Sequence, residues 1–202
     1  MKIAIGSNII NSAWGGGNNF VKNISNYLIN KGHKVFYNLT PNDLDIILLT
    51  DPRVESSTST INHLDINNYL KKNYNTIVIH RVNECDERKN TTGVNKQLIY
   101  ANKFCDYTVF ISEWLQKIFK KEITSDQKVI LNGANKEIFN FGSCNYENNK
   151  VFKIVTHHWS NHKNKGFEIY KYLDQKLSIK NYKDKIKFSI IGNIPKDYNF
   201  VN

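Results

Sequence analysis

Residues 2–37, KIAIGSNIINSAWGGGNNFVKNISNYLINKGHKVFY, decide the fold because their hydrophobic period changes twice. The apolar run at residues 2–6 predicts a strand, and the polar, glycine-rich residues 7–17 predict a loop. From Asn18 onward, apolar side chains recur at the spacing of one helix face, namely Phe20, Ile24, Tyr27 and Leu28. Residues 33–37 then predict a second strand. A strand, a helix and a strand in this order indicate a βαβ unit of a parallel sheet.

The ends of this first helix also carry sequence signals. Asn18 or Asn19 is expected to cap its start, since a side-chain oxygen there can accept a backbone N–H bond. Gly32 stands where helices commonly end in left-handed geometry.

The alternation continues beyond this unit. Further short apolar runs predict strands, and stretches with helical spacing predict helices, in the order 45–50 strand, 59–72 helix, 76–80 strand, 93–103 helix, 107–111 strand, 113–121 helix and 128–131 strand. Continuous apolar runs are typical of strands buried on both faces of a parallel sheet. The sequence therefore predicts an α/β fold with a Rossmann-like, doubly wound parallel sheet.

A second unit is expected after an irregular segment. Residues 132–150 are rich in Asn and Gly without sustained periodicity, so they indicate a linker. Residues 151–156 and 186–191 predict strands around a helix at 166–177, which is one further βαβ unit. We therefore expect one domain at residues 1–145, and at 146–202 the beginning of a second, incomplete Rossmann-like domain, because one βαβ unit has too little core to cover both faces of its strands.

Composition excludes some classes and leaves others open. Hydrophobic residues make up 40% and charged residues 23%, with 11 Tyr, 11 Phe and 3 Trp, which disordered chains lack. Three widely spaced cysteines argue against a disulfide framework or a zinc site, and no apolar run reaches the length of a membrane span. The expected location is the cytoplasm, with peripheral contact to an anionic membrane face left open. The net charge of +10 also leaves polyanion binding open, although no nucleic-acid motif is present.

The ligand site of such a sheet lies beyond the carboxyl ends of its strands. There the first loop ends in Gly15-Gly16-Gly17, followed by Asn18, at the start of a helix. Bare backbone N–H groups, aided by the helix dipole, can approach an anion such as a diphosphate. The alternative is a loop that needs glycine only for positive φ angles. The dinucleotide fingerprint and the Walker motif are both absent.

Two further strand ends supply candidate residues. His80 ends the run at 76–80 and Arg81 follows it, and Arg81 is one of only three arginines in the chain. We expect these two side chains to be catalytic or to contact an acceptor or sugar, because arginine can bind a phosphate through two parallel hydrogen bonds. For His80 the alternative is a hydrogen-bonded structural histidine.

The run His157-His158-Trp159-Ser160-Asn161-His162 precedes Lys163, Lys165 and Gly166. Adjacent histidines on a strand point to opposite faces, and no Glu or Cys stands at ligand spacing, so no metal is expected. Lys163 and Lys165 beside a helix start suit a phosphorylated ligand better.

These motifs, taken in order, resemble one family. They are Gly15-Gly16 before an amphipathic helix, Gly32-His33-Lys34-Val35 after it, Phe110-Ile111-Ser112-Glu113-Trp114, Ile130-Leu131-Asn132-Gly133-Ala134 with Phe139, and Lys165-Gly166. Their order and spacing are similar to those of nucleotide-sugar glycosyltransferases of the GT-B fold, in the large retaining family four. The resemblance implies two facing Rossmann-like domains, with the acceptor held mainly by the first and the donor mainly by the second.

The resemblance also implies residue roles. The Gly15-Gly16-Gly17 turn and Lys165 would bind the donor phosphates, with Asn18, Ser160 and Lys163 as further donor or acceptor contacts. At the position of the family's usual arginine this chain has Ser160, or Trp159 if the loop is shifted. Its paired glutamates, spaced eight apart, would lie after residue 202, so the chain alone is expected to be inactive.

The implied activity is transfer of a sugar, with retained configuration and without metal or cofactor, to a saccharide or lipid-linked acceptor in surface polysaccharide synthesis. A non-catalytic sugar-phosphate or partner-binding module of the same fold remains an alternative.

Overall fold

The computed structural model describes residues 1–12, 14–54, 56–140, 151–179, 182 and 184–200. Contacts divide the chain into two compact units, Met1–Gly133 and Ala134–Asn202. The predicted domain boundary at 145/146 lies outside the described residues, as does Cys144.

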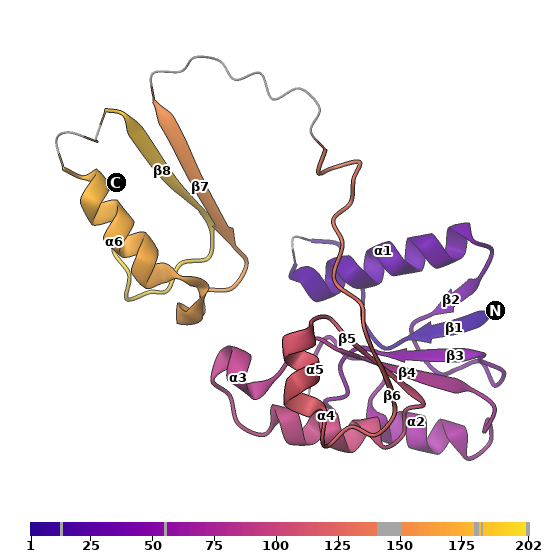
Figure 1. Cartoon of the computed structure of the whole chain (residues 1–202). Coiled ribbons are helices and arrows are strands. Elements are labelled where there is room, and N and C mark those ends of the chain that lie inside the picture. Colours follow the sequence, from indigo (N-terminus) through magenta and orange to yellow (C-terminus); the bar gives the residue numbers. More distant parts are fainter. Residues whose placement is uncertain (13, 55, 141–150, 180–181, 183, 201–202) are drawn as a thin grey trace. The chain divides into compact units, whose positions relative to one another are not determined.

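The first unit is built on six parallel strands (Figure 1). In chain order they are β1 (Lys2–Ile5), β2 (Lys34–Phe36), β3 (Ile46–Leu49), β4 (Ile77–Val82), β5 (Tyr107–Phe110) and β6 (Asp126–Val129). Their order across the sheet is β2-β1-β3-β4-β5-β6, with every neighbouring pair parallel. This is an α/β, Rossmann-like sheet, which confirms that part of the prediction.

Five helices connect these strands. They are α1 (Gly16–Asn30), α2 (His63–Leu70), α3 (Asp86–Lys89), α4 (Val94–Asn102) and α5 (Glu113–Phe119). The short α3 falls where the sequence gives no helical signal. Gly32 ends α1 with a positive φ of 80°, as predicted. The predicted cap at Asn18 or Asn19 is wrong, because α1 begins at Gly16 and Gly15 is its N-cap residue.

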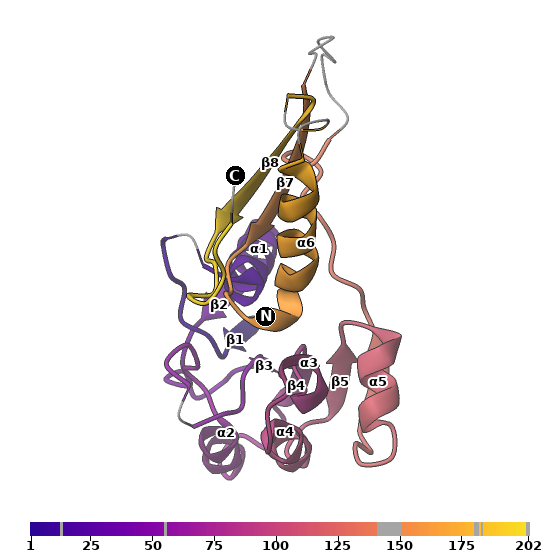
Figure 2. The same cartoon turned by 90° about the vertical axis from the view of Figure 1, so that its left-hand side faces the viewer.

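The two faces of the sheet carry different helices (Figures 1 and 2). Helix α1 lies on one face, where Val21 packs with Ile3 and Ile5 of β1. Helices α2 and α4 lie side by side on the other face (Figure 2). Since β1 contributes Ala4 to that second face, its side chains alternate as a strand buried on both sides requires.

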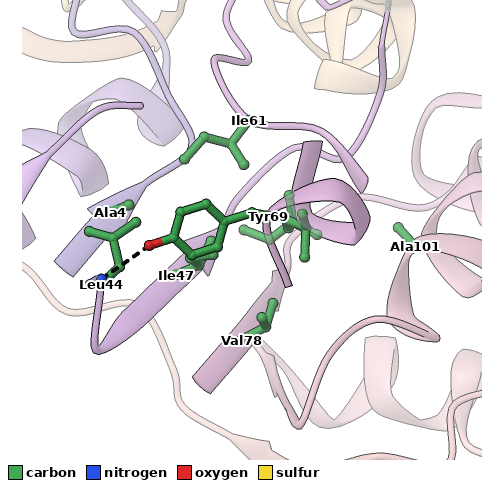
Figure 3. Close-up of a cluster of buried hydrophobic side chains, with 9 residues drawn as sticks. Ala4, Leu44, Ile47, Ile61, Tyr69, Val78 and Ala101 are labelled. Atoms are coloured by element: carbon green, nitrogen blue, oxygen red, sulfur yellow. Dashed lines mark hydrogen bonds between the residues drawn. The ribbon is translucent and has the colours of Figure 1, made fainter. Parts of the chain in front are cut away.

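One polar group is central to the second face. Figure 3 shows the Tyr69 hydroxyl accepting a hydrogen bond from the backbone N–H of Leu44, at 3.1 Å. The same hydroxyl donates to the carbonyl of Pro41 at 2.7 Å. A buried hydroxyl with both partners satisfied ties α2 to the segment before β3 without an unpaired polar atom.

The second unit is described by itself. Its strands β7 (Phe152–His158) and β8 (Ile186–Gly192) are parallel, and α6 (Phe167–Leu177) connects them, preceded by a 3-10 turn, η1 (Lys163–Lys165). The buried ring of Phe167 packs against His158 and Tyr170. The predicted βαβ unit is therefore present.

Candidate functional site

The chain reverses direction across the sheet between β1 and β3. It leaves β1 through α1 to reach β2 on one side, and then crosses to β3 on the other side of β1. In open α/β sheets, ligands bind outside the carboxyl ends of the strands at such a switch point.

A cavity of about 180 Å³ lies at this place, which we call the inner pocket. Most lining residues follow the ends of β1, β3 and β4, and α4 adds two more. They are Ser7, Asn8, Trp14, Gly15, Gly17, Asn18 and Val21 after β1, Thr50, Asp51, Pro52, Arg53 and Thr58 after β3, Arg81, Asn83 and Glu84 at the end of β4, and Val94 and Leu98 on α4.

The start of α1 presents open backbone to this region. Gly15 has no side chain to cap the helix, and the carbonyl of Gly15 accepts from the backbone N–H of Asn18. Among the described residues, the N–H groups of Gly16 and Gly17 donate to no acceptor. These are two of the first N–H groups of a 15-residue helix, where the dipole favours an anion.

The glycines of this turn are not required by backbone conformation. Gly15 has φ −64°, and neither Gly16 nor Gly17 has a positive φ. A β-carbon at Gly16 or Gly17 would meet nothing within 4 Å. The alternative that the turn needs glycine for positive φ is therefore excluded, and the open backbone faces free space.

Arg81 lies in the pocket wall without a carboxylate partner. Its side chain extends from β4 on the face of the sheet that α1 covers, and only 6% of the residue is exposed. The guanidinium carbon lies 3.8 Å from the ring centre of Phe20, and Nη2 donates to the Asn132 side-chain oxygen at 3.0 Å. Burial lowers the pKa of Arg81 to about 10, so the group is still a cation at neutral pH.

The carboxylates of the inner pocket are already paired. Asp51 accepts two parallel bonds from Arg53, each 2.8 Å long. Burial alone raises the pKa of Asp51, but hydrogen bonds from Arg53 and Ser56 outweigh it and hold that pKa below its usual value. Glu84 pairs with Lys89. Arg81 is thus the cation of the pocket wall that has no anionic partner among the described residues.

His80 lies on the opposite face of β4 and does not line the inner pocket. Its ring is fully buried, and Nδ1 accepts from the side-chain amide of Asn102 at 3.2 Å. That amide also donates to Thr108, and Ser125 bonds both Thr108 and Asn102. A catalytic role for His80 stays a prediction, and the structure does not bring its ring to the pocket.

Burial lowers the pKa of His80 to about 4, against an opposing effect of the Asp51 charge. The ring is therefore neutral at physiological pH. Since an amide nitrogen only donates, Nδ1 is the acceptor and the ring proton is on Nε2, which has no partner in the described part of the chain.

Asn18 is placed at the pocket but uses its amide elsewhere. Its oxygen accepts from the backbone N–H of Ile10 at 2.8 Å, and its nitrogen donates to the carbonyl of Ile10 at 2.9 Å. This pair of bonds holds the loop after β1 against α1. The predicted ligand contact by the Asn18 side chain therefore competes with a structural role.

A larger cavity of about 660 Å³, the outer pocket, shares Pro52, Arg53, Thr58 and Val94 with the inner one. Hydroxyl, amide and imidazole groups supply much of its described lining, namely those of Ser56, Ser57, Thr58, Thr92, Gln97 and His63. Such groups suit a ligand with many hydroxyls, because each can donate and accept.

In the second unit, Lys165 ends the η1 turn, and the following Gly166 has φ 87°, a conformation that favours glycine. Lys165 is exposed and has no ion pair among the residues that the structure describes. Lys163 is paired with Asp197, and the Ser160 hydroxyl accepts from the backbone N–H of His162. Of the three predicted contacts, Lys165 alone has its charged group uncommitted within these ranges.

The histidine run does not form a metal centre. His158 Nε2 bonds the hydroxyl of Tyr170 at 2.9 Å, while His157 is on the other face of β7. No group of three His, Cys, Asp or Glu side chains within the described ranges could hold a metal ion.

Sequence reasoning missed three groups that shape the inner pocket. Asp51 and Arg53 follow β3 directly, so their place at a strand end was a usable signal. Phe20 is on the predicted apolar face of α1, and nothing in its spacing indicates that it stacks on a guanidinium.

Comparison with known proteins adds no assignment. No family model matches the chain, and no curated protein is significantly similar to it. None of the described helices combines the length and the apolar character that crossing a bilayer requires.

Proposed function

We propose that this chain belongs to a GT-B glycosyltransferase that moves a sugar from a nucleotide-sugar to a saccharide or glycolipid acceptor with retention. The observation that carries the proposal is the open start of α1. Its unpaired N–H groups adjoin a pocket at the switch point of the sheet, and its glycines have no conformational reason to be glycine. Such a helix start suits a diphosphate.

The reaction gives these groups a chemical task. The bond from the anomeric carbon to the diphosphate oxygen breaks, a bond to an acceptor hydroxyl oxygen forms, and the hydroxyl proton leaves with the diphosphate or solvent. Negative charge grows on the leaving diphosphate, so N–H groups and cations aimed at it stabilise the transition state. The Gly15-Gly16-Gly17 turn and Lys165 are proposed for this role.

The outer pocket supports the acceptor side of the proposal. Its volume is in the range of pockets that hold small organic ligands, and its hydroxyl-rich lining suits saccharide hydroxyls. Synthesis of a surface polysaccharide or glycolipid, at the cytoplasmic side of a membrane, is the proposed setting.

The test combines binding with product formation. Nucleotide-sugars are titrated into the chain by calorimetry, and transfer is measured on the chain and on the longest natural form of the protein. Lys165→Met is expected to lower nucleotide-sugar affinity or turnover about tenfold or more, while Lys187→Met, an exposed control on β8, leaves both unchanged. Binding without turnover in the longest form would replace the proposal by a non-catalytic sugar-phosphate module.

A further inference from the structure

We infer that Arg81 and the open start of α1 form one oxyanion site in the first unit, and that this site binds the diphosphate of the donor. The inference rests on the proposed function for the identity of the ligand. It gives Arg81 a different role from the predicted one: Arg81 binds the leaving diphosphate, whereas the sequence analysis expects it to contact the acceptor or the sugar.

The first step of the argument is the cost of burying Arg81. A cation that is removed from water is expensive unless an anion or several acceptors replace the lost hydration. Within the described part of the chain, Arg81 has one neutral acceptor, Asn132, and one aromatic ring, Phe20. A guanidinium has five N–H groups, so most of its donor capacity is unused.

The second step is that this unused capacity is reachable. The buried side-chain polar atoms without a partner, within the described ranges, are those of Ser25, Thr60 and His80. The free N–H groups of Arg81 are not among them, and Arg81 lines the inner pocket. The guanidinium is therefore held by Phe20 and Asn132 while its remaining donors stay accessible from the cavity.

The third step is the shared pocket. Gly15 and Gly17 line the same cavity as Arg81, so helix N–H groups and a guanidinium bound one small space. The pocket carboxylates are satisfied by Arg53 and Lys89, and so do not compete for Arg81. A cavity of about 180 Å³ is too small for a whole nucleotide-sugar and suits a phosphoryl group of one.

The probe for the test is inorganic pyrophosphate, because it carries the diphosphate chemistry without a base or a sugar. Arg81→Gln is expected to weaken pyrophosphate binding by calorimetry about tenfold or more, since a bidentate charge-assisted contact is lost. Arg88→Gln is the matched control, because Arg88, whose Nη1 donates to the carbonyl of Asn83, is not itself a lining residue of the inner pocket. It should change the affinity less than about twofold.

A second variant guards against misfolding of the first. Gly17→Ala places a methyl group at the pocket where the fold leaves space, so it should fold and still weaken pyrophosphate binding. Unchanged affinity in Arg81→Gln, no pyrophosphate binding by the unmodified chain, or Arg81-dependent binding of an acidic saccharide without pyrophosphate binding would each overturn the inference.

The inference and the proposed function fail in different ways. Sugar transfer by the natural protein together with undiminished pyrophosphate affinity in Arg81→Gln leaves the function standing and removes the site. Arg81-dependent pyrophosphate binding together with no transfer from any nucleotide-sugar leaves the oxyanion site standing and removes the function.

Discussion

The two faces of β4 hold polar side chains in opposite ways. On the α4 face, His80 belongs to a buried network with Asn102, Thr108 and Ser125, in which nearly every polar atom has a protein partner. On the α1 face, Arg81 is almost as deeply buried but has a single hydrogen bond to the residues that the structure describes. The difference teaches that burial alone does not separate a structural polar residue from a binding one.

What separates them is the partner that completes the hydrogen bonding. A network completed by the protein rigidifies the fold, and its disruption costs stability. A buried charged group that lacks some hydrogen-bond partners beside a cavity lowers the stability of the free protein, and a bound ligand can supply those partners. Changes on the two faces should therefore affect different measurements.

The largest effect is expected on the α4 face. Asn102→Ala removes the amide that bonds His80, Thr108 and Ser125, and leaves these buried groups short of partners. We expect a loss of about 3 kcal/mol in the free energy of unfolding, measured in urea. Lys96→Ala on the exposed side of α4 is the control, with a change below about 0.5 kcal/mol. A cost as small as that of the control would show that the network is not structural.

A pH effect of somewhat smaller size is expected from His80. Its folded-state pKa of about 4 lies below the ordinary value of 6.5, so the unfolded chain binds a proton more readily. The stability from the neutral ring is complete above pH 6.5 and is lost as the pH falls from 6.5 towards 4. Between pH 7 and pH 5 the loss from this group is about 2 kcal/mol.

The measurement is urea unfolding at pH 7 and pH 5, with His80→Asn as the comparison. The variant should lose most of the pH dependence, because its amide does not titrate in this range. An equal pH dependence in both proteins would assign the effect to other groups.

The sequence predicts most of the fold, because short apolar runs that alternate with stretches of helical spacing are a strong signal of alternating strands and helices. Every strand of the first unit lies within about two residues of its predicted position. β6, expected at 128–131, lies two residues earlier, at Asp126–Val129. β4, expected to end at His80, runs to Val82.

That displacement has a physical reason. An apolar run ends at its first polar residue, but Arg81 pairs with Val109 in the parallel ladder and so continues the strand. Once both residues are inside a strand, their side chains must point to opposite faces. The sequence could therefore have placed His80 and Arg81 on opposite faces of the sheet only if the end of β4 had been known.

The contacts of Arg81 were beyond sequence reasoning. Phe20 and Asn132 lie far from Arg81 in sequence and meet it only through tertiary packing. By contrast, the glycine turn could be found, because three consecutive glycines at a helix start are unusual whatever the packing.

Arg81→Met tests the other face of β4 for stability. The methionine side chain can still pack on Phe20, and the lost hydrogen bond to Asn132 is offset by removal of a buried charge. The free energy of unfolding should therefore change by less than about 1 kcal/mol, while pyrophosphate binding weakens about tenfold or more. A destabilisation of about 3 kcal/mol would make Arg81 a structural residue like Asn102.

The smallest expected effect on stability comes from alanine at Gly16 or Gly17, and this pair of variants separates stability from ligand binding. Gly16→Ala and Gly17→Ala each replace a glycine in the first turn of α1, where a β-carbon meets nothing within 4 Å. Alanine restricts the unfolded chain and favours the helix, so both variants should gain about 0.5 kcal/mol in the free energy of unfolding. Only Gly17 lines the inner pocket, so only Gly17→Ala should also weaken pyrophosphate binding.

Thermal unfolding and calorimetry on this matched pair separate the two roles of the turn. A residue kept for stability loses stability when it is replaced, whereas a residue kept for ligand access gains stability and loses affinity. If Gly17→Ala gains stability and keeps its affinity, the open N–H groups of α1 do not face the ligand, and the oxyanion site is reduced to Arg81 alone.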